Sequence, residues 1–252
     1  MIVAPIKTSK ITIDNTSLFS VLDQYLPSLR EKSVVVVTSK IVSICEGRVQ
    51  KKVGNEKKDA LAIQEAELYL PRHENQYGFM ITINQGTMIA SAGIDESNGN
   101  GYFVLWPKNP QKSANDIRRY LIKKHHLKQL GVIISDSRIT PLRRGVTGVS
   151  IAHSGFRLLN DYVGKPDIFG RIMKVEKANI ADSLATAAVV AMGEGNEQQP
   201  LCVIKDLDFV HFQDRDPTIE ELKNNRTTIE TDVFSKMLKA AKWQNGKKGV
   251  KK

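Results

Sequence analysis

The chain has 252 residues, of which 41% are hydrophobic and 25% are charged, so these totals predict a folded protein with an apolar core and exclude disorder as the default. The formal charge of +10 is concentrated at one end, because residues 236–252 hold seven lysines and no acidic residue, and about +3 remains without them. We therefore do not expect nucleic acid as a partner, and we predict a flexible lysine-rich tail over 243–252.

Neither a membrane span nor a secretory leader is indicated. No apolar run approaches the roughly 18–20 residues that a spanning helix needs, and the first residues lack the apolar centre of a signal peptide. The two cysteines, Cys45 and Cys202, have no metal-binding or redox spacing and are typical of small buried residues in a reducing compartment. We expect a cytoplasmic protein.

The first half of the chain alternates helical and strand patterns. Residues 16–26 begin with hydroxyl side chains and predict a helix. Residues 33–44 open with four valines, which predict a strand buried on both faces. Residues 57–70 predict a helix that ends at a proline, and residues 86–93 predict a weaker strand.

The second half continues the alternation. Residues 113–126 predict a helix with a capping box that begins at its first serine, and residues 131–137 predict a buried strand. A helix of small residues over 179–192 and a strand over 200–206 follow, and residues 218–242 predict one or two amphipathic helices. The pattern predicts a mixed α/β (α+β) fold with two subdomains.

Acidic residues follow several of these elements, where ligands gather in α/β proteins. Asp95 lies on a glycine-rich loop, Asp136 with Ser137 ends a strand, and Glu194 lies between two glycines after a helix. Carboxylates and hydroxyls are the ligands that Mg²⁺ or Mn²⁺ prefers, so these residues are candidates for a divalent-metal site. Each also has an ordinary interpretation, as a turn residue or as part of a helix cap.

Two adjacent arginines, Arg143 and Arg144, precede a glycine-rich apolar stretch. Their planar guanidinium groups are suited to a phosphate or a carboxylate, although a pair of surface charges fits equally well. The sequence holds no Walker-type phosphate loop, no dinucleotide fingerprint, no zinc-protease motif and no serine-hydrolase elbow. Any nucleotide must therefore be held in another way.

Taken together, seven segments resemble the coenzyme F420-0:L-glutamate ligase family, GTP-dependent gamma-glutamyl ligases that extend a deazaflavin coenzyme. They occur in the family's order and are 38–48 (TSKIVSICEGR), 91–98 (SAGIDESN), 131–137 (GVIISDS), 143–156 (RRGVTGVSIAHSGF), 161–171 (DYVGKPDIFGR), 179–195 (NIADSLATAAVVAMGEG) and 200–207 (PLCVIKDL). The resemblance covers roughly residues 1–212, which predicts a ligase-like domain there and a separate helical segment over 213–252.

The resemblance implies two intertwined α/β subdomains in a homodimer, with GTP as co-substrate, two Mg²⁺ or Mn²⁺ ions in each site and K⁺ as a further cation. It implies a first metal on Asp95, Asp136 and Ser137, and a second metal on Glu194. The nucleotide would contact Ser9, Lys10, Ile11, Thr12, Ser39, Lys40, Asn98, Met192, Gly193, Glu194, Gly195, Asn196 and Glu197. Arg143 or Arg144 would hold the acceptor carboxylate or the transferred phosphoryl group, which is our own assignment.

Two departures from the family pattern bear on the substrate. Ile44 stands where the family usually has a lysine, and the early segment 8–12 lacks a usual Leu-Pro pair. The expected reaction joins L-glutamate to a carboxylate acceptor through an acyl phosphate, and the acceptor is coenzyme F420-0, a folate or another gamma-glutamyl-accepting compound. A metal-dependent phosphohydrolase and a nucleic-acid-binding module are the alternatives of other classes.

Overall fold

A five-stranded sheet forms the centre of the larger lobe. The computed structural model describes residues 1–13, 17–52 and 56–249. The sheet has the order β1-β12-β2-β8-β9, in which β2 and β8 run parallel and the other neighbours run antiparallel. Its strands are β1 (Ile2–Ile6), β12 (Leu201–Lys205), β2 (Ser33–Thr38), β8 (Leu130–Arg138) and β9 (Thr147–Ser154).

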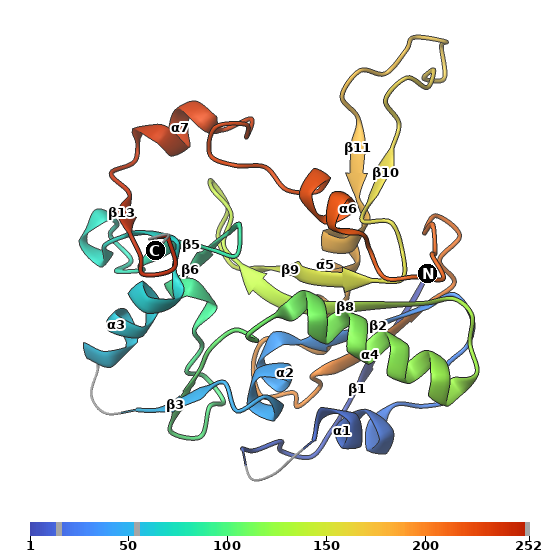
Figure 1. Ribbon diagram of the computed structural model, residues 1–252, viewed down its shortest axis with the longest axis horizontal. Coiled ribbons are helices and arrows are strands. Elements are labelled where there is room, and N and C mark those ends of the chain that lie inside the picture. The colour runs from blue at the N-terminus through green and yellow to red at the C-terminus, as the bar shows by residue number, and fades with distance from the viewer. Residues whose placement is uncertain (14–16, 53–55, 250–252) are drawn as a thin grey trace.

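The valine run builds both faces of this sheet. Because strand side chains alternate between faces, Val35 and Val37 pack on one side and Val34 and Val36 on the other. The first face is covered by α1 (Leu18–Tyr25), α2 (Ser39–Cys45) and α4 (Pro110–His125), and the second is covered by α5 (Ile180–Met192) (Figure 1). The predicted burial of this strand on both faces is confirmed.

Several predicted elements have different bounds in the structure, among them three in the first half of the chain. The segment 33–44 is a strand only to Thr38, after which α2 begins, because the polar residues at 38–40 start a helix. The helix predicted over 57–70 ends at Glu65, and β4 (Leu68–Leu70) follows. The helix predicted over 16–26 spans Leu18–Tyr25, and Thr16 lies outside the described residues.

The start of α4 also differs from the prediction. Asn109 is the N-terminal cap, and its side chain accepts a hydrogen bond from the Lys112 backbone at 3.0 Å. Pro110 occupies the first turn, where its missing N–H costs nothing. Ser113, which was expected to be the cap, lies inside the helix and donates a hydrogen bond to Glu46 Oε1 at 2.6 Å.

The smaller lobe is built around a four-stranded sheet with the order β13-β4-β5-β6 (Figure 1). It contains α3 (Glu56–Glu65), β4, η1 (Arg72–Glu74), β5 (Ile81–Asn84), β6 (Thr87–Ala90) and η2 (Ser91–Gly93), with a ribbon of β3 (Val49–Lys51) and β7 (Tyr102–Val104). Its core is separate from those of the larger lobe and includes Met80, Ile94 and Phe103.

The last described segment returns to this smaller lobe. After α6 (Ile219–Asn224) and α7 (Ser235–Ala240), the strand β13 (Gln244–Asn245) pairs with β4. The backbone N–H groups of Gly246 and Lys247 then donate to Glu67 and Ile63, both at 2.9 Å. Residues 244–249 therefore make backbone contacts with β4 and with the end of α3, in a segment for which the sequence predicted a flexible tail from residue 243.

The strands β10 (Leu159–Asp161) and β11 (Lys177–Asn179) form a ribbon that projects from the body, and we call residues 159–179 the arm (Figure 1). The mixed α/β fold class is confirmed. The division of the chain at residue 212 stays a prediction. Within the described residues, every helix is too short or too polar to cross a bilayer.

Candidate active site

A cavity of about 660 Å³ opens where β2 and β8 end side by side. The ends of parallel strands are a common place for ligands in α/β folds. Every residue predicted from the resemblance to bind metal or nucleotide lines this one cavity, although these residues come from five separate segments of the chain. They are Ser9, Lys10, Ile11, Thr12, Ser39, Lys40, Asp95, Asn98, Asp136, Ser137, Met192, Gly193, Glu194, Gly195, Asn196 and Glu197.

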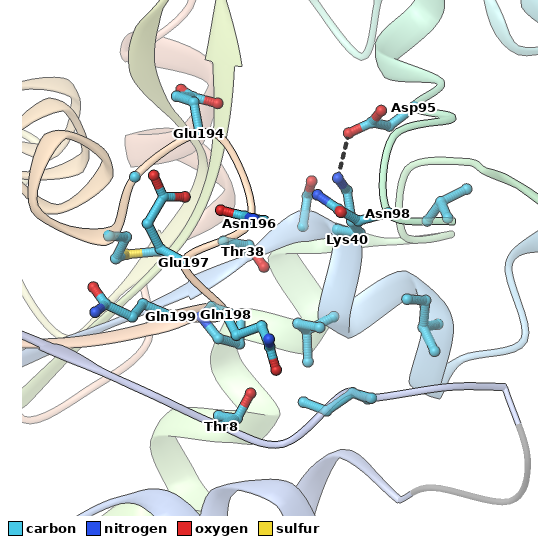
Figure 2. A pocket seen from close by; sticks show the side chains of 18 of the residues that line it. Thr8, Thr38, Lys40, Asp95, Asn98, Glu194, Asn196, Glu197, Gln198 and Gln199 are labelled. Atoms are coloured by element: carbon cyan, nitrogen blue, oxygen red, sulfur yellow. Dashed lines mark ion pairs between the residues drawn. The ribbon is translucent and has the colours of Figure 1, made fainter. Parts of the chain in front are cut away.

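Lys40 brings a positive charge into the cavity from the first turn of α2. Its Nζ lies 2.6 Å from Asp95 Oδ2 and 3.0 Å from the backbone oxygen of Ser97 (Figure 2). The other oxygen of Asp95 accepts hydrogen bonds from the N–H and the hydroxyl of Ser97, both at 2.8 Å. Burial works to raise the pKa of Asp95, but Lys40 and Ser97 outweigh it, and the pKa lies below its usual value. Asp95 is therefore an anion at neutral pH.

Asp136 is at the end of β8, with a donor on each carboxylate oxygen. Trp106 Nε1 donates to Oδ2, and the Ser137 N–H donates to Oδ1 at 2.8 Å. Burial raises the pKa of Asp136 to about 6, and the negative charge of Asp95 adds to this effect, while hydrogen bonds from Trp106, Ser137 and Ser39 oppose it. Above that pH, two neighbouring carboxylates are charged together, an arrangement that favours a bound cation.

Glu194 reaches the cavity from the loop that follows α5. Figure 2 shows Glu194 and Glu197 on one side of the cavity and the pair of Lys40 and Asp95 on the other. Burial raises the pKa of Glu194, a hydrogen bond from Ser137 lowers it, and the charges of Asp95 and Glu197 raise it further.

Two hydrogen bonds join the loops around the cavity. The Asn98 side chain donates to the Gly195 oxygen at 3.0 Å and connects the 91–98 loop to the 193–199 loop. The Thr8 N–H donates to the Gln198 oxygen at 2.8 Å and connects the segment after β1 to the same loop.

The oxygen donors of the cavity fit a hard divalent cation that is also bound by phosphate. Across the described part of the chain, no three Asp, Glu, His or Cys side chains converge closely enough to hold a metal ion by themselves. Mg²⁺ in nucleotide sites is commonly held by one or two carboxylates, with phosphate oxygens and waters completing the set. Asp95, Asp136 and the Ser137 hydroxyl supply such a partial set.

The two arginines with a predicted catalytic role lie elsewhere. Arg143 and Arg144 are exposed on the 139–146 loop between β8 and β9, and neither lines the cavity. The Arg143 side chain donates a hydrogen bond to the backbone oxygen of Leu142 at 3.4 Å. Their predicted catalytic role stays a prediction.

The cavity also contains residues that the sequence did not single out. Thr8, Thr38 and Ser135 line it, and each is next to a predicted residue in the chain, while Gln198 and Gln199 belong to the stretch 192–199 that the resemblance places along the nucleotide. Proximity in sequence was the only signal for the first three. Trp106, which hydrogen-bonds Asp136, lies in an apolar segment more than ten residues after Asp95. Nothing in the sequence indicated that it contacts the site.

The position of the family's lysine is also at the cavity wall. Ile44 is 7% exposed and lines the cavity beside Ile11 and Val104. The same three residues line a small apolar recess that adjoins the cavity. This end of the cavity is therefore apolar. Lys40 is the lysine that α2 places at the cavity wall.

Comparison with known proteins gives one consistent result. The sequence profile of F420-0:Gamma-glutamyl ligase matches residues 6–206. A protein named Coenzyme F420:L-glutamate ligase from Methanococcus maripaludis is 36% identical over 82% of this chain and 86% of its own length. Proteins of the same name from Methanocaldococcus jannaschii and Methanosarcina barkeri are 34% and 32% identical, over 76% and 92% of this chain and 82% and 97% of their own lengths.

Proposed function

Because this chain belongs to the F420-0:gamma-glutamyl ligase family and is a ligase, we propose that it joins L-glutamate to coenzyme F420-0 with GTP as co-substrate. The observation that carries this proposal is the convergence of Asp95, Asp136, Ser137 and Glu194 on one cavity. Lys40 lines the same cavity, which provides a positive charge for phosphate.

The chemistry requires that a carboxylate become an electrophile. In the proposed reaction an acceptor carboxylate oxygen attacks the terminal phosphorus of GTP, the bond from that phosphorus to the β-phosphate oxygen breaks, and GDP leaves. The glutamate amine then attacks the acyl-phosphate carbon, a C–N bond forms, inorganic phosphate departs and the amine loses a proton. Both steps bring anions together, so the site needs positive charge.

The donor set suits Mg²⁺ or Mn²⁺, with Asp95, Asp136 and Ser137 as ligands of one ion and Glu194 as ligand of a second. When bound, such ions neutralise phosphate charge and align the reacting groups. The chain itself contributes Lys40 for the phosphates and Asn98 for the nucleotide. The loop 193–199 and the segment 9–12 enclose the nucleotide from two sides, which fits their place around the cavity.

The identity of the acceptor is tested by product mass. The protein is incubated with GTP, L-glutamate and either coenzyme F420-0 or a folate, and the products are weighed by mass spectrometry. We expect the mass of F420-0 to increase by one glutamate residue. The apolar wall at Ile44 is the feature that keeps a folate-like acceptor as the second candidate, because a lysine is replaced there.

The reaction class is tested with Asp136→Ala. We expect the rate of ligation to fall by orders of magnitude while the far-ultraviolet circular dichroism stays that of the parent. Ligation by this variant at the parental rate would refute the site. Release of phosphate by the parent protein without glutamate would instead indicate a phosphohydrolase.

We propose in addition that the arm, residues 159–179, mediates a homodimer. Ile168, Phe169 and Val175 are 92%, 90% and 78% exposed on it, and large apolar side chains gathered on a projecting ribbon are typical of a contact with another chain. Light scattering after gel filtration should give twice the mass of the 28.1 kDa chain. Phe169→Glu should reduce that mass to one chain, whereas a parent protein of one-chain mass would contradict the proposal.

A further inference from the structure

Trp106 is a buried tryptophan whose only polar side-chain atom contacts the candidate site. It lies two residues after β7 and is 2% exposed. Its indole Nε1 donates a hydrogen bond to Asp136 Oδ2. Its backbone oxygen accepts a hydrogen bond from Arg48 Nε at 3.1 Å, and Arg48 is paired with Glu65 of the smaller lobe at 2.8 Å. The backbone of Trp106 is therefore tied to the smaller lobe, while its indole contacts a residue of the larger lobe.

The hydrogen bond to Asp136 fixes the orientation of its carboxylate. An indole N–H can only donate a hydrogen bond, and the same holds for the backbone N–H of Ser137, which donates to the other carboxylate oxygen. Both oxygens therefore serve as acceptors, and the carboxylate cannot rotate without losing one donor. The Ser39 side chain also hydrogen-bonds Asp136, and both residues line the cavity.

The same indole supports the loop that carries Asp95. Gly93 has a backbone φ of +75°, and a β-carbon added to it would lie 2.1 Å from Trp106 Nε1 and 2.4 Å from Cε2. No side chain fits at such distances, so the backbone two residues before Asp95 packs directly on the indole. Trp106 thus touches both acidic segments, one through its N–H and the other through its ring.

We propose that Trp106 is a positioning residue that orients Asp136 and sets its separation from Asp95, so that both carboxylates bind one divalent cation. This inference rests on the proposed function, since it assumes that the two carboxylates are metal ligands. An aliphatic residue would fill the same apolar space but would leave the carboxylate of Asp136 with one donor fewer.

The first test compares Mn²⁺ binding by two variants that differ in what they keep of Trp106. Trp106→Phe keeps an aromatic ring and loses the N–H. Trp106→His loses the larger ring, but its Nε2 occupies the place of the indole nitrogen in the five-membered ring and restores a donor. Binding is measured from the electron paramagnetic resonance signal of free Mn²⁺, and the fold is checked by circular dichroism and thermal unfolding.

Trp106→Phe should bind Mn²⁺ about 10–100-fold more weakly than the parent, as is typical when a group that orients a ligand is lost. Trp106→His should bind more tightly than Trp106→Phe even though its smaller polar ring makes it the less stable of the two. If Trp106 had a purely structural role, the less stable Trp106→His would bind Mn²⁺ more weakly than Trp106→Phe. That order of affinities would overturn the inference. If Trp106→Phe bound Mn²⁺ as tightly as the parent, only the inference about Trp106 would be overturned. If the parent protein bound no Mn²⁺, the proposed metal site would be overturned as well.

The second test leaves Trp106 intact and does not depend on how its variants fold. The sequence has two tryptophans, and the other, Trp243, donates its Nε1–H to the Leu238 oxygen at 2.7 Å in the C-terminal segment. Trp243→Phe therefore has a single indole next to Asp136 and should bind Mn²⁺ like the parent. Its fluorescence should be quenched saturably by Mn²⁺ and recovered with excess Mg²⁺. Unchanged fluorescence at saturating Mn²⁺ would overturn the inference.

Discussion

Gly93→Ala tests how closely the Asp95 loop packs on Trp106. The added methyl group would lie 2.1 Å, 2.4 Å and 2.6 Å from three atoms of the indole, none of which is at the end of a flexible side chain. The left-handed φ of +75° costs alanine about 1–2 kcal/mol, and overpacking of a buried site costs about 1–3 kcal/mol more. We therefore expect the free energy of unfolding to fall by about 2–5 kcal/mol.

Gly47 provides a matched control for this variant. It has a similar φ of +69°, but a β-carbon there would have no neighbour within 4 Å. Gly47→Ala should therefore lose only the backbone cost of about 1–2 kcal/mol. Urea unfolding followed by circular dichroism compares the two variants without relying on tryptophan fluorescence, which Gly93→Ala would disturb. Equal losses of stability would refute the close packing, because they would mean that the indole moves aside at no cost.

Three further predictions concern charge. Since the pKa of Asp136 is raised to about 6, its carboxyl is protonated below that pH. Mn²⁺ affinity should therefore fall about tenfold per pH unit below 6 and level off above 7. Equal affinity at pH 5 and pH 7 would contradict this prediction. Lys40→Met should weaken GTP binding about tenfold or more in calorimetry, because a charged donor is lost, without weakening the binding of Mn²⁺ alone, since Lys40 also neutralises Asp95. Arg118→Met should lower stability by about 1–3 kcal/mol in urea unfolding, because the buried guanidinium loses its hydrogen bonds to Asp216, Leu130 and Gln213, and it should leave Mn²⁺ binding unchanged.

The parts of the fold that the sequence predicted well are those with a strong local pattern. The valine run is apolar over its whole length, and the helix at 180–192 consists mostly of small and apolar residues, so the local pattern identifies both. The boundary at Thr38 was missed because Ile41, Val42 and Ile44 continue the apolar pattern beyond the polar residues 38–40, and only the spacing of the apolar residues changes from that of a strand to that of a helix. The cap of α4 was misplaced because both Asn109 and Ser113 are suitable capping residues, and tertiary contact with Glu46 decides between them.

The candidate site divides in the same way. Residues on recognisable loops, such as Asp95 and Glu194, were found from order and spacing, and all of them reach one cavity. Trp106 could not be found, because its role depends on two segments that meet only in the folded chain. Arg143 and Arg144 had a suggestive composition, but the turn between β8 and β9 leaves them in solvent.

The pairing of β13 with β4 has a consequence for synthesis on the ribosome. Strand β4 and helix α3 are made early, yet the partners of their free backbone groups are residues 244–249. A growing polypeptide therefore carries an unfinished smaller lobe, with an open strand edge, throughout the translation of the central sheet. That lobe can close only after residues 244–249 have left the exit tunnel, so its assembly follows the synthesis of the whole central sheet.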